Sequence, residues 1–392
     1  MDARAPGSGD DPSPLGIYLH IPFCSSICPY CNFTRALLDD ALKERYVPAL
    51  EREIRAAGDG ARADSVYFGG GTPSLLDPTE VDRVIRACRA SFDVASSAEV
   101  TLEANPETLT TRSLAGYREA GVNRLSLGVQ SFRDEELRRL GRLHTAETSR
   151  RAVALARRAG FDNVSLDLML WLPQQTTVQL MESVEGLIEV GPEHASLYLL
   201  ELYPNAALRD EMAREGWSLA PDEDAASMYL GAMDRLEGAL YQQYEISNVS
   251  RPGRRSRHNL KYWTGGEWVG FGCGAHSTRG GTRWKNVAAV EHYVERVESG
   301  LRVAVDHRPL SPAEQLEEAL FMGLRLADGV DLDAVGARFG VDVWARYGGR
   351  LAPYLEAGLL VHEAGQARLT RRGMLLANEV MSAFVEADST VK

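Results

Sequence analysis

Three cysteines near the start of this 392-residue chain have the spacing that most directly suggests chemistry. Cys24, Cys28 and Cys31 follow the pattern CxxxCxxC, and the chain has five cysteines in all. Closely spaced thiolates are the usual ligands of iron–sulfur clusters, which most often use four. With three thiolates, a 4Fe–4S cluster keeps one iron open to a ligand from outside the protein, as catalytic metals keep a vacant position. The pattern therefore predicts a reactive 4Fe–4S centre.

Two alternatives use the same thiols. A structural zinc site would take its fourth ligand from a distant part of the chain, and a reactive thiol loop would hold no metal. Zinc sites favour paired CxxC spacings, and no second pair accompanies Cys28 and Cys31. We therefore favour the cluster. Cys88 falls on the apolar face of a predicted helix and is interpreted as a core residue.

The elements around these cysteines indicate an α/β architecture. Amphipathic stretches at residues 41–57, 78–92 and 145–159 are predicted helices. Strands recurring at intervals of roughly 25–40 residues with helical crossovers indicate parallel βα units. The spacing fits a barrel-like or a doubly wound sheet, and periodicity alone does not decide between them. The predicted strands begin near Ile17, Ser65, Glu99, Arg124, Asn163 and His194.

The chain divides into four predicted parts. Residues 1–14, rich in Gly, Pro, Ser and Asp, are predicted to be a disordered leader. Residues 15–235 form the α/β core and 236–302 an extension. Residues 303–392 form a small C-terminal helical domain, in which a capping box at 311–314 starts a series of helix, helix, hairpin and helix. That order resembles a winged-helix domain.

Composition limits the classes of partner. The formal net charge of −12 argues against general binding of nucleic acid, including DNA binding by the winged-helix-like part. The N-terminus lacks the apolar stretch of a signal peptide, and no uncharged apolar run reaches the ~18 residues of a membrane span. An odd number of cysteines, three of them clustered, does not suit a disulfide scaffold. We expect a cytoplasmic protein.

Further segments match one superfamily. Together with the cysteines and with Tyr30 before the last of them, these segments resemble the radical S-adenosylmethionine (SAM) superfamily, in the branch of oxygen-independent coproporphyrinogen III oxidase. The resemblance covers nearly the whole chain after the leader. It implies a partial (β/α)6 radical SAM barrel with a small C-terminal winged-helix-like domain. The matching segments are residues 18–24 (YLHIPFC), 69–73 (GGGTP), 103–106 (EANP) and 126–132 (SLGVQSF).

The resemblance also implies the cofactors. In this superfamily SAM chelates the open iron of the cluster, and the cofactors rather than the protein carry the chemistry. The residues alone add that Gly70 and Gly71 permit close approach of the backbone. Glu103, Gln130 and Asp167 are each expected at the C-terminal end of a separate strand, and such polar strand ends collect at one edge of a parallel sheet. Capping, solvated or core roles are the alternatives. The implied SAM contacts are Tyr18, Tyr30, Gly70, Gly71, Thr72, Glu103, Gln130, Arg142 and Asp167.

Two features separate the branches of the family. The oxidase resemblance calls for a further cysteine two positions after Cys31, where this chain has Phe33. Residues 258–263 read HNxxYW, which is similar to heme chaperones of the HemW type. His258 is thus a candidate ligand of heme iron, with Cys273 as a second candidate and nearby arginines as partners of the propionates. The alternative is a structural motif in which His258 is hydrogen-bonded and the two rings lie in the core.

The resemblance therefore implies a heme chaperone that binds a 4Fe–4S cluster, SAM and heme and delivers heme to an apo-hemoprotein. A membrane protein is one kind of transient client that would suit this role. The alternative function is that of an oxygen-independent coproporphyrinogen III oxidase, which carries out a radical SAM oxidative decarboxylation in heme biosynthesis. Whether the chain is an enzyme stays open, because SAM cleavage suits the fold while Phe33 argues against the oxidase reaction.

Overall fold

The computed structural model of the protein describes residues 13–385. Residues 1–12 of the predicted leader therefore lie outside the described residues. Within the described range, no helix is long and apolar enough to cross a membrane.

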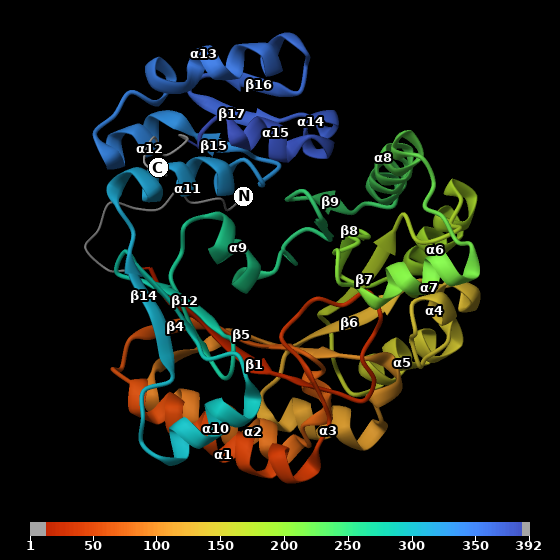
Figure 1. Ribbon diagram of the computed structural model, residues 1–392, viewed down its shortest axis with the longest axis vertical. Helices are drawn as coiled ribbons and strands as arrows, with labels where there is room; N and C mark the ends of the chain where they lie inside the picture. Colours follow the sequence, from red (N-terminus) through yellow and green to blue (C-terminus); the bar gives the residue numbers. More distant parts are fainter. Residues whose placement is uncertain (1–12, 386–392) are drawn as a thin grey trace.

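A 12-stranded sheet forms the main body of the molecule (Figure 1). Its central six strands are parallel, and they lie side by side in the order in which they occur in the chain. Parallel strands joined by helical crossovers in chain order are the arrangement of a (β/α) barrel, here an open one with six units. The predicted α/β fold class is confirmed. The six strands are β1 (Leu15–Ile21), β4 (Arg62–Gly70), β5 (Asp93–Ala104), β6 (Arg124–Gln130), β7 (Val164–Leu170) and β8 (His194–Leu199).

Amphipathic helices connect these strands and cover the outer face of the sheet. In α2, the side chain of Asp77 caps the first turn and Pro78 occupies the first helical position, as expected for a helix start. Cys88 lies fully buried on the inward face of this helix, so its predicted core position is confirmed. The helices of this part are α1 (Asp40–Ala57), α2 (Pro78–Ser91), α3 (Thr111–Ala120), α4 (Asp134–Arg139), α5 (Ala146–Arg158), α6 (Thr177–Val190), α7 (Ala207–Glu215) and α8 (Asp222–Gly238).

The Gly- and Trp-rich extension enlarges the sheet at its β1 edge. Strand β11 (Trp268–Phe271) pairs in parallel with β1, and three antiparallel strands follow it. Helix α9 (Arg257–Trp263) lies over the inner face of the sheet, whereas α10 (Val290–Glu298) packs beside α1 on the outer face (Figure 1). The remaining strands are β12 (His276–Arg279), β13 (Thr282–Asn286) and β14 (Ala304–Pro309) at this edge, β10 (Asn248–Ser250) and β9 (Gln242–Gln243) at the other, and the short pair β2 (Phe23–Cys24) and β3 (Ala36–Leu37).

The register of β1 separates an apolar face from a polar one. Ile17 and Leu19 are fully buried in the core under the helices, because alternate side chains of a strand point to opposite faces. Tyr18 points the other way and stacks on Tyr67 of β4, with ring centroids 6.2 Å apart. Position 16 faces α9, since a Cβ on Gly16 would lie 3.0 Å from His258 Cε1. The inner face therefore carries the polar residues.

The C-terminal part has the helix, strand, helix, helix, hairpin order of a winged-helix domain. The capping box predicted at Ser311 and Glu314 is present. The sequence reading of two helices before the hairpin was wrong, because Gly340 ends one helix in a left-handed turn and a third begins at Val343. The elements are α11 (Pro312–Gly323), β15 (Val330–Asp331), α12 (Leu332–Phe339), α13 (Val343–Glu356), β16 (Leu360–Glu363), β17 (Gln366–Leu369), α14 (Arg371–Leu375) and α15 (Ala377–Ser382).

Candidate functional site

The three clustered cysteines lie on the loop that follows β1. Cys24 is buried in β2, while Cys28 and Cys31 are half-buried. The amide of Cys31 donates to the carbonyl of Cys28 at 3.1 Å, which closes the loop into a turn. Burial raises the pKa of the Cys24 thiol, and the neighbouring Cys31 and Cys28 raise it further. The three thiols are therefore close enough to interact electrostatically.

This donor set fits a 4Fe–4S cluster. Among residues 13–385, no three candidate ligands close around a single metal ion. Cluster thiolates need not converge in that way, because each binds a different iron. The guanidinium of Arg142 lies 3.6 Å from Cys28 Sγ, and its buried Nε has no acceptor among the described residues. A positive side chain with an unused donor beside the thiols is suited to an anionic group bound next to the cluster.

The glycines at the end of β4 make room for the cysteine loop. Gly70 has a φ of +120°, and a Cβ there would lie 2.7 Å from Cε1 of His20. A Cβ on Gly71 would lie 2.7 Å from the carbonyl oxygens of Pro22 and Phe23. The glycines therefore let the strand end lie against the backbone of the loop.

The residue after these glycines holds the first cysteine. The amide of Thr72 donates to the carbonyl of Phe23 at 2.7 Å, and its hydroxyl lies 3.7 Å from Cys24 Sγ. Asn105 in turn donates to the Thr72 hydroxyl at 3.2 Å. The GGGTP and EANP segments thus support Cys24 together.

Tyr18 and His20 hold the C-terminal end of the cysteine loop, at Thr34. His20 Nε2 lies 2.9 Å from the carbonyl of Thr34, so this nitrogen carries the proton and donates. Its Nδ1 then accepts from the Tyr18 hydroxyl at 3.1 Å. Burial lowers the pKa of His20, which keeps the ring neutral and this arrangement in place. The inner face of β1 therefore anchors the loop three residues after Cys31.

Two carboxyl groups share the inner face. Glu103 of β5 accepts from the Tyr67 hydroxyl at 2.7 Å and from the Gly70 amide at 3.2 Å, and burial raises its pKa to about 7. Burial also raises the pKa of Asp167 to about 6. The expectation that Asp167 ends its strand was wrong, because β7 continues through three more buried residues. The charge of Asp167 is nevertheless close enough to raise the pKa of Glu103.

Gln130 and Arg142 lie beside the cysteines at the next strand end. Gln130 closes β6 with a φ of +69° where the register with β7 shifts. Arg142 donates to Asn105 Oδ1 at 2.6 Å and to the Gly128 carbonyl at 2.7 Å. Tyr30 packs against a separate apolar cluster that includes Met212 of α7.

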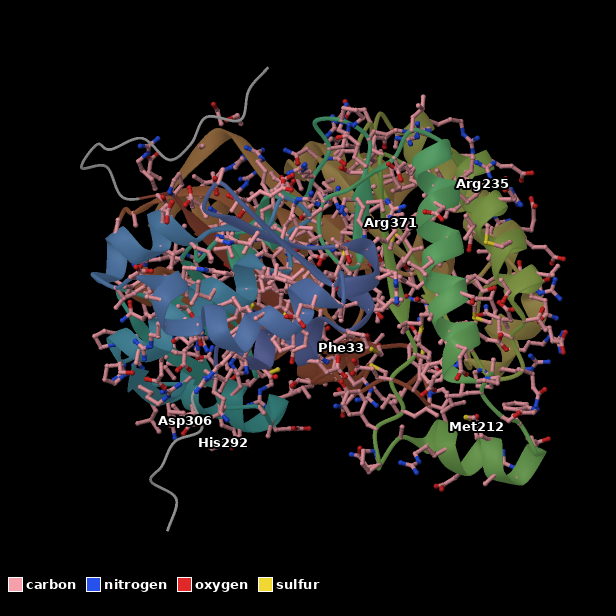
Figure 2. All side chains as sticks on the ribbon, turned by 90° about the horizontal axis from the view of Figure 1, so that it is seen from above. Phe33, Met212, Arg235, His292, Asp306 and Arg371 are labelled. Atoms are coloured by element: carbon pink, nitrogen blue, oxygen red, sulfur yellow. The ribbon has the colours of Figure 1, made fainter. Side chains whose placement is uncertain are left out.

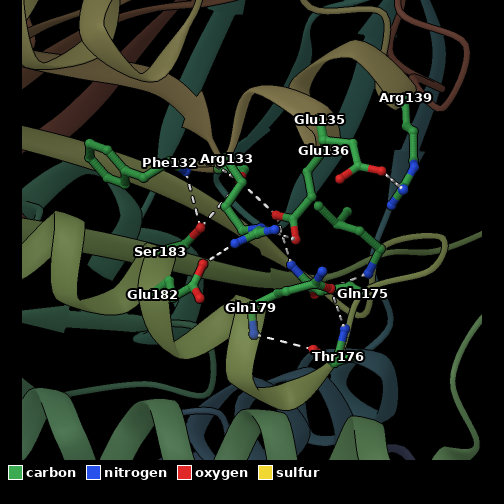
Figure 3. Close-up of polar contacts among 12 residues, drawn as sticks. Phe132, Arg133, Glu135, Glu136, Arg139, Gln175, Thr176, Gln179, Glu182 and Ser183 are labelled. Carbon is green, nitrogen blue, oxygen red and sulfur yellow. Dashed lines mark hydrogen bonds and ion pairs between the residues drawn. The ribbon is translucent and has the colours of Figure 1, made fainter.

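A buried polar network fixes the turn that follows Gln130. Ser131 donates to Glu136 at 2.6 Å, and Gln175 donates to the same carboxylate at 3.1 Å (Figure 3). The amide of Phe132 donates to the Ser183 hydroxyl at 3.1 Å. These buried hydrogen bonds, two of them to Oε2 of Glu136, hold the end of the SLGVQSF segment in place.

The HNxxYW motif lies within α9, where its histidine packs against Tyr67, the residue that donates to Glu103. His258 is 1% exposed, with Nδ1 at 3.0 Å from Ser65 Oγ and Nε2 at 2.9 Å from the Tyr262 hydroxyl. Burial lowers the pKa of His258 to about 3. Its ring stacks on Tyr67 with centroids 5.1 Å apart. Both nitrogens are engaged, as in the structural alternative, and heme iron can reach neither while these contacts hold.

The other heme contacts expected near this motif are also engaged. Arg254 pairs with Asp162 at 3.2 Å and Arg255 with Asp328 at 3.0 Å. Cys273 is fully buried, 3.7 Å from the Tyr46 hydroxyl, which leaves no space for a macrocycle at its sulfur. His258 and Cys273 therefore have the packing of core residues, whereas the Tyr262 and Trp263 rings of the motif are half-buried.

Sequence reasoning missed three supporting residues. Tyr67 binds Glu103, Asn105 joins Arg142 to Thr72, and Thr34 receives His20. Asn105 was within a matching segment without an assigned role. Tyr67 was detectable by its place two residues before Gly69, on the same strand face.

The chain resembles known proteins over most of its length. The radical SAM superfamily profile matches residues 18–187, and the HemN C-terminal domain profile matches residues 310–376. Heme chaperone HemW of Bacillus subtilis is 37% identical over 376 residues, covering 94% of this chain and 98% of that protein. Heme chaperone HemW of Escherichia coli is 39% identical over 268 residues, covering 67% and 70%. A mitochondrial radical S-adenosyl methionine domain-containing protein 1 of Bos taurus is 37% identical over 343 residues, covering 83% and 77%.

A solved structure shares the fold. Coproporphyrinogen III oxidase HemN of Escherichia coli superposes with a TM-score of 0.85 at 23% identity, covering 95% of this chain and 90% of that one. The open barrel and the cysteine loop are those of a radical SAM protein, a class that implies a 4Fe–4S cluster and SAM. Within that class, the chain belongs to the HemW family of heme chaperones.

Proposed function

We propose that this protein binds heme and delivers it to an apo-hemoprotein, as a heme chaperone that also holds a 4Fe–4S cluster and SAM. The observation that carries the proposal is the near end-to-end similarity to Heme chaperone HemW of Bacillus subtilis, 37% identical over 376 residues. Similarity over both the barrel and the C-terminal part supports a shared function of the whole chain, beyond a shared barrel chemistry. A membrane-bound client stays a prediction.

The cluster and SAM have residues suited to hold them. Cys24, Cys28 and Cys31 would bind three irons, and the cluster, when bound, supplies an electron for cleavage of SAM. The unused Nε donor of Arg142 would orient the carboxylate of SAM. Glu103 would accept from its amino group, since its two oxygens accept from Tyr67 and from the Gly70 amide and each carboxylate oxygen has a second lone pair.

The remaining predicted contacts would shape this site. The glycines bring the end of β4 against the cysteine loop, and Thr72 would hold Cys24 in position. Asp167 would keep a negative potential near Glu103. The other proposed contacts are Tyr18, Tyr30, Gly70, Gly71 and Gln130.

Phe33 supports the chaperone over the oxidase. Its side chain is 71% exposed, at the position where the oxidase resemblance calls for a cysteine (Figure 2). A phenyl ring offers neither a thiol for radical or proton transfer nor a metal ligand. We therefore expect no decarboxylation of coproporphyrinogen III.

The test has two arms. Hemin is titrated into the purified protein and the Soret band of bound heme is followed, with saturable binding expected. In the second arm, the reconstituted protein is incubated anaerobically with reductant, SAM and coproporphyrinogen III, and no protoporphyrinogen is expected. Absence of saturable heme binding would end the chaperone proposal. Formation of protoporphyrinogen would establish the oxidase instead.

A further inference from the structure

A cavity of about 720 Å³ lies between the extension of the sheet and helix α1. Its walls come from α1, the C-terminal end of α2, the strands β11 to β14, and α10 with the segment that follows it. This volume is within the ~300–1,000 Å³ of sites for small molecules and cofactors. None of the cluster cysteines or proposed SAM contacts lines this cavity.

The register of the sheet places this cavity on the face opposite the SAM site. Val269 and Phe271 of β11 pair with Ile17 and Leu19, the outward residues of β1. Tyr18, which belongs to the SAM face, lies between them and points the other way. A ligand in this cavity would therefore leave the cluster and SAM site untouched.

Two views show elements around the cavity on the side of the molecule away from α7. Strand β14, which carries Asp306, and α10, which carries His292, lie together in Figure 1 and in Figure 2. Helix α7, marked by Met212, lies on the far side in both views. Met212 belongs to the apolar cluster that packs against Tyr30 of the cysteine loop.

Flat and apolar surfaces line the cavity. The Phe92 and Phe271 rings pack with centroids 6.0 Å apart, beside Val269. Trp284 of β13 contributes an indole that stacks on His307 of β14, with centroids 5.3 Å apart and planes at 5°. Leu301 at the rim is 56% exposed, a large apolar side chain facing water. Such walls suit a flat aromatic ligand.

His307 has the tautomer that a metal requires. Its Nε2 lies 2.6 Å from Nη2 of Arg302. A guanidinium can only donate, so Nε2 is the acceptor and holds its lone pair free of a proton. Desolvation and then Arg302 lower the pKa of His307, which favours the same neutral ring. Neutral imidazole is a common ligand of heme iron.

The cavity also has two arginines, Arg52 and Arg302, that form no ion pair with a carboxylate in the described part of the chain. Within residues 13–385, Arg52 makes no hydrogen bond or ion pair, and the side chain of Arg302 hydrogen-bonds only to His307. Glu298 is near enough to Arg52 to interact with it electrostatically, although it pairs with Arg45. The third arginine of the lining, Arg279, pairs with Asp59 at 2.8 Å.

One carboxyl group in the wall does not offset this charge. Glu53 accepts from Tyr293, Asn286 and the Gly272 amide, and burial raises its pKa to about 7. It is therefore engaged within the protein and only partly ionised at neutral pH. Two arginines are left for acidic groups of a ligand.

We propose that this cavity binds heme, with His307 as a ligand of the iron and with Arg52 and Arg302 paired to the two propionates. The proposal rests on the proposed function and names the site where that function takes place. On binding, Arg302 releases Nε2 of His307, whose lone pair forms a coordinate bond to iron without any change of oxidation state. Phe271 and Trp284 would contact the macrocycle.

The first test titrates hemin into the wild type and His307→Ala. We expect at least a tenfold loss of affinity and a changed Soret maximum in the variant. His362→Ala is the matched control, because His362 stacks on Trp344 with centroids 3.9 Å apart and does not line the cavity. An unchanged affinity and spectrum in His307→Ala would overturn the proposal. Absence of binding by the wild type would instead overturn the proposed function.

The second test compares heme with its dimethyl ester. If the arginines pair with propionates, the wild type should bind the free acid at least tenfold more tightly than the ester. The double variant Arg52→Gln/Arg302→Gln should lose that preference while keeping its cluster absorbance, which shows that it is folded. Equal preference in the wild type and the double variant would contradict the propionate assignment.

Discussion

The hydroxyl of Tyr67 donates a hydrogen bond of 2.7 Å to Oε1 of Glu103. On its other side the same ring stacks on His258, with centroids 5.1 Å apart. The HNxxYW motif therefore packs on the inner face of the sheet and holds Tyr67 in position beside Glu103. Its histidine reaches Glu103 through Tyr67, which makes His258 a positioning residue for the SAM site under the proposed function.

The first prediction concerns this support. His258→Ala removes the stacked ring and two hydrogen bonds, so we expect SAM affinity to fall by about tenfold, or about 1.4 kcal/mol. Heme affinity should be unchanged, since the proposed heme site is on the opposite face. Equilibrium binding of SAM and of hemin measures both. Loss of heme binding with intact SAM binding would reverse the assignment.

Glu103 gives the site a dependence on pH. Its pKa of about 7 means that it ionises as pH rises through neutrality. SAM is a sulfonium cation, so its affinity should rise between pH 6 and pH 8, by roughly tenfold at most for one pH unit. Glu103→Gln should bind weakly with no such rise. Tyr67→Phe should move the midpoint to higher pH, because the Tyr67 hydrogen bond lowers the pKa of Glu103.

The same carboxyl group affects stability with a definite sign. Its folded pKa, about 7, is above the ordinary value of 4.5, so its contribution is complete at low pH and is lost as pH rises toward 7. Urea unfolding of the wild type and Glu103→Gln at pH 5, 6 and 7 tests this. The variant should gain about 1.4 kcal/mol relative to the wild type for each pH unit. A constant difference across this range would show that Glu103 is not protonated on folding.

The cysteine assignment can be tested with a control from the same chain. Replacing Cys24, Cys28 or Cys31 with alanine should abolish the visible absorbance of the cluster and lower the iron content after anaerobic reconstitution. Cys88→Ala should retain both, because Cys88 lies buried in the core on α2. Full iron content in any of the first three variants would count against that ligand.

The tight packing of β4 against the cysteine loop predicts an unequal pair of glycine variants. Gly70→Ala places a Cβ 2.7 Å from His20 at a φ of +120°, whereas a Cβ on Gly60 at +72° meets nothing within 4 Å. We expect a loss of about 3 kcal/mol or more at Gly70 and about 1 kcal/mol at Gly60. Thermal unfolding of the two variants provides the comparison.

Much of the barrel could be predicted from local patterns. The central strands are short apolar runs whose residues are mostly buried on both faces, and such runs can be recognised as strands from the sequence. The CxxxCxxC spacing and the GGGTP segment are likewise short motifs that can be recognised from the sequence alone. Strand β11 was missed because its pairing with β1 joins residues about 250 positions apart, such as Gly16 and Trp268, which no local pattern contains.

The same limit explains the uncertainty over His258. Its role depends on Ser65, 193 residues earlier, and on the helix that brings Tyr262 to its other nitrogen. The residue type and the HNxxYW resemblance made the histidine a candidate ligand of iron and did not show that both of its nitrogens are engaged. His307, in contrast, has no distinctive neighbours in sequence, and only the pairing of β13 with β14 places it beside Trp284.

Heme transfer tests the central claim most directly. Heme-loaded protein is mixed anaerobically with an excess of an apo-hemoprotein, the two are separated by size, and heme is measured in each by its Soret band. We predict that heme moves to the acceptor faster from this protein than from serum albumin loaded to the same extent. If heme stays with the protein, or leaves it no faster than it leaves albumin, the protein is not a heme chaperone.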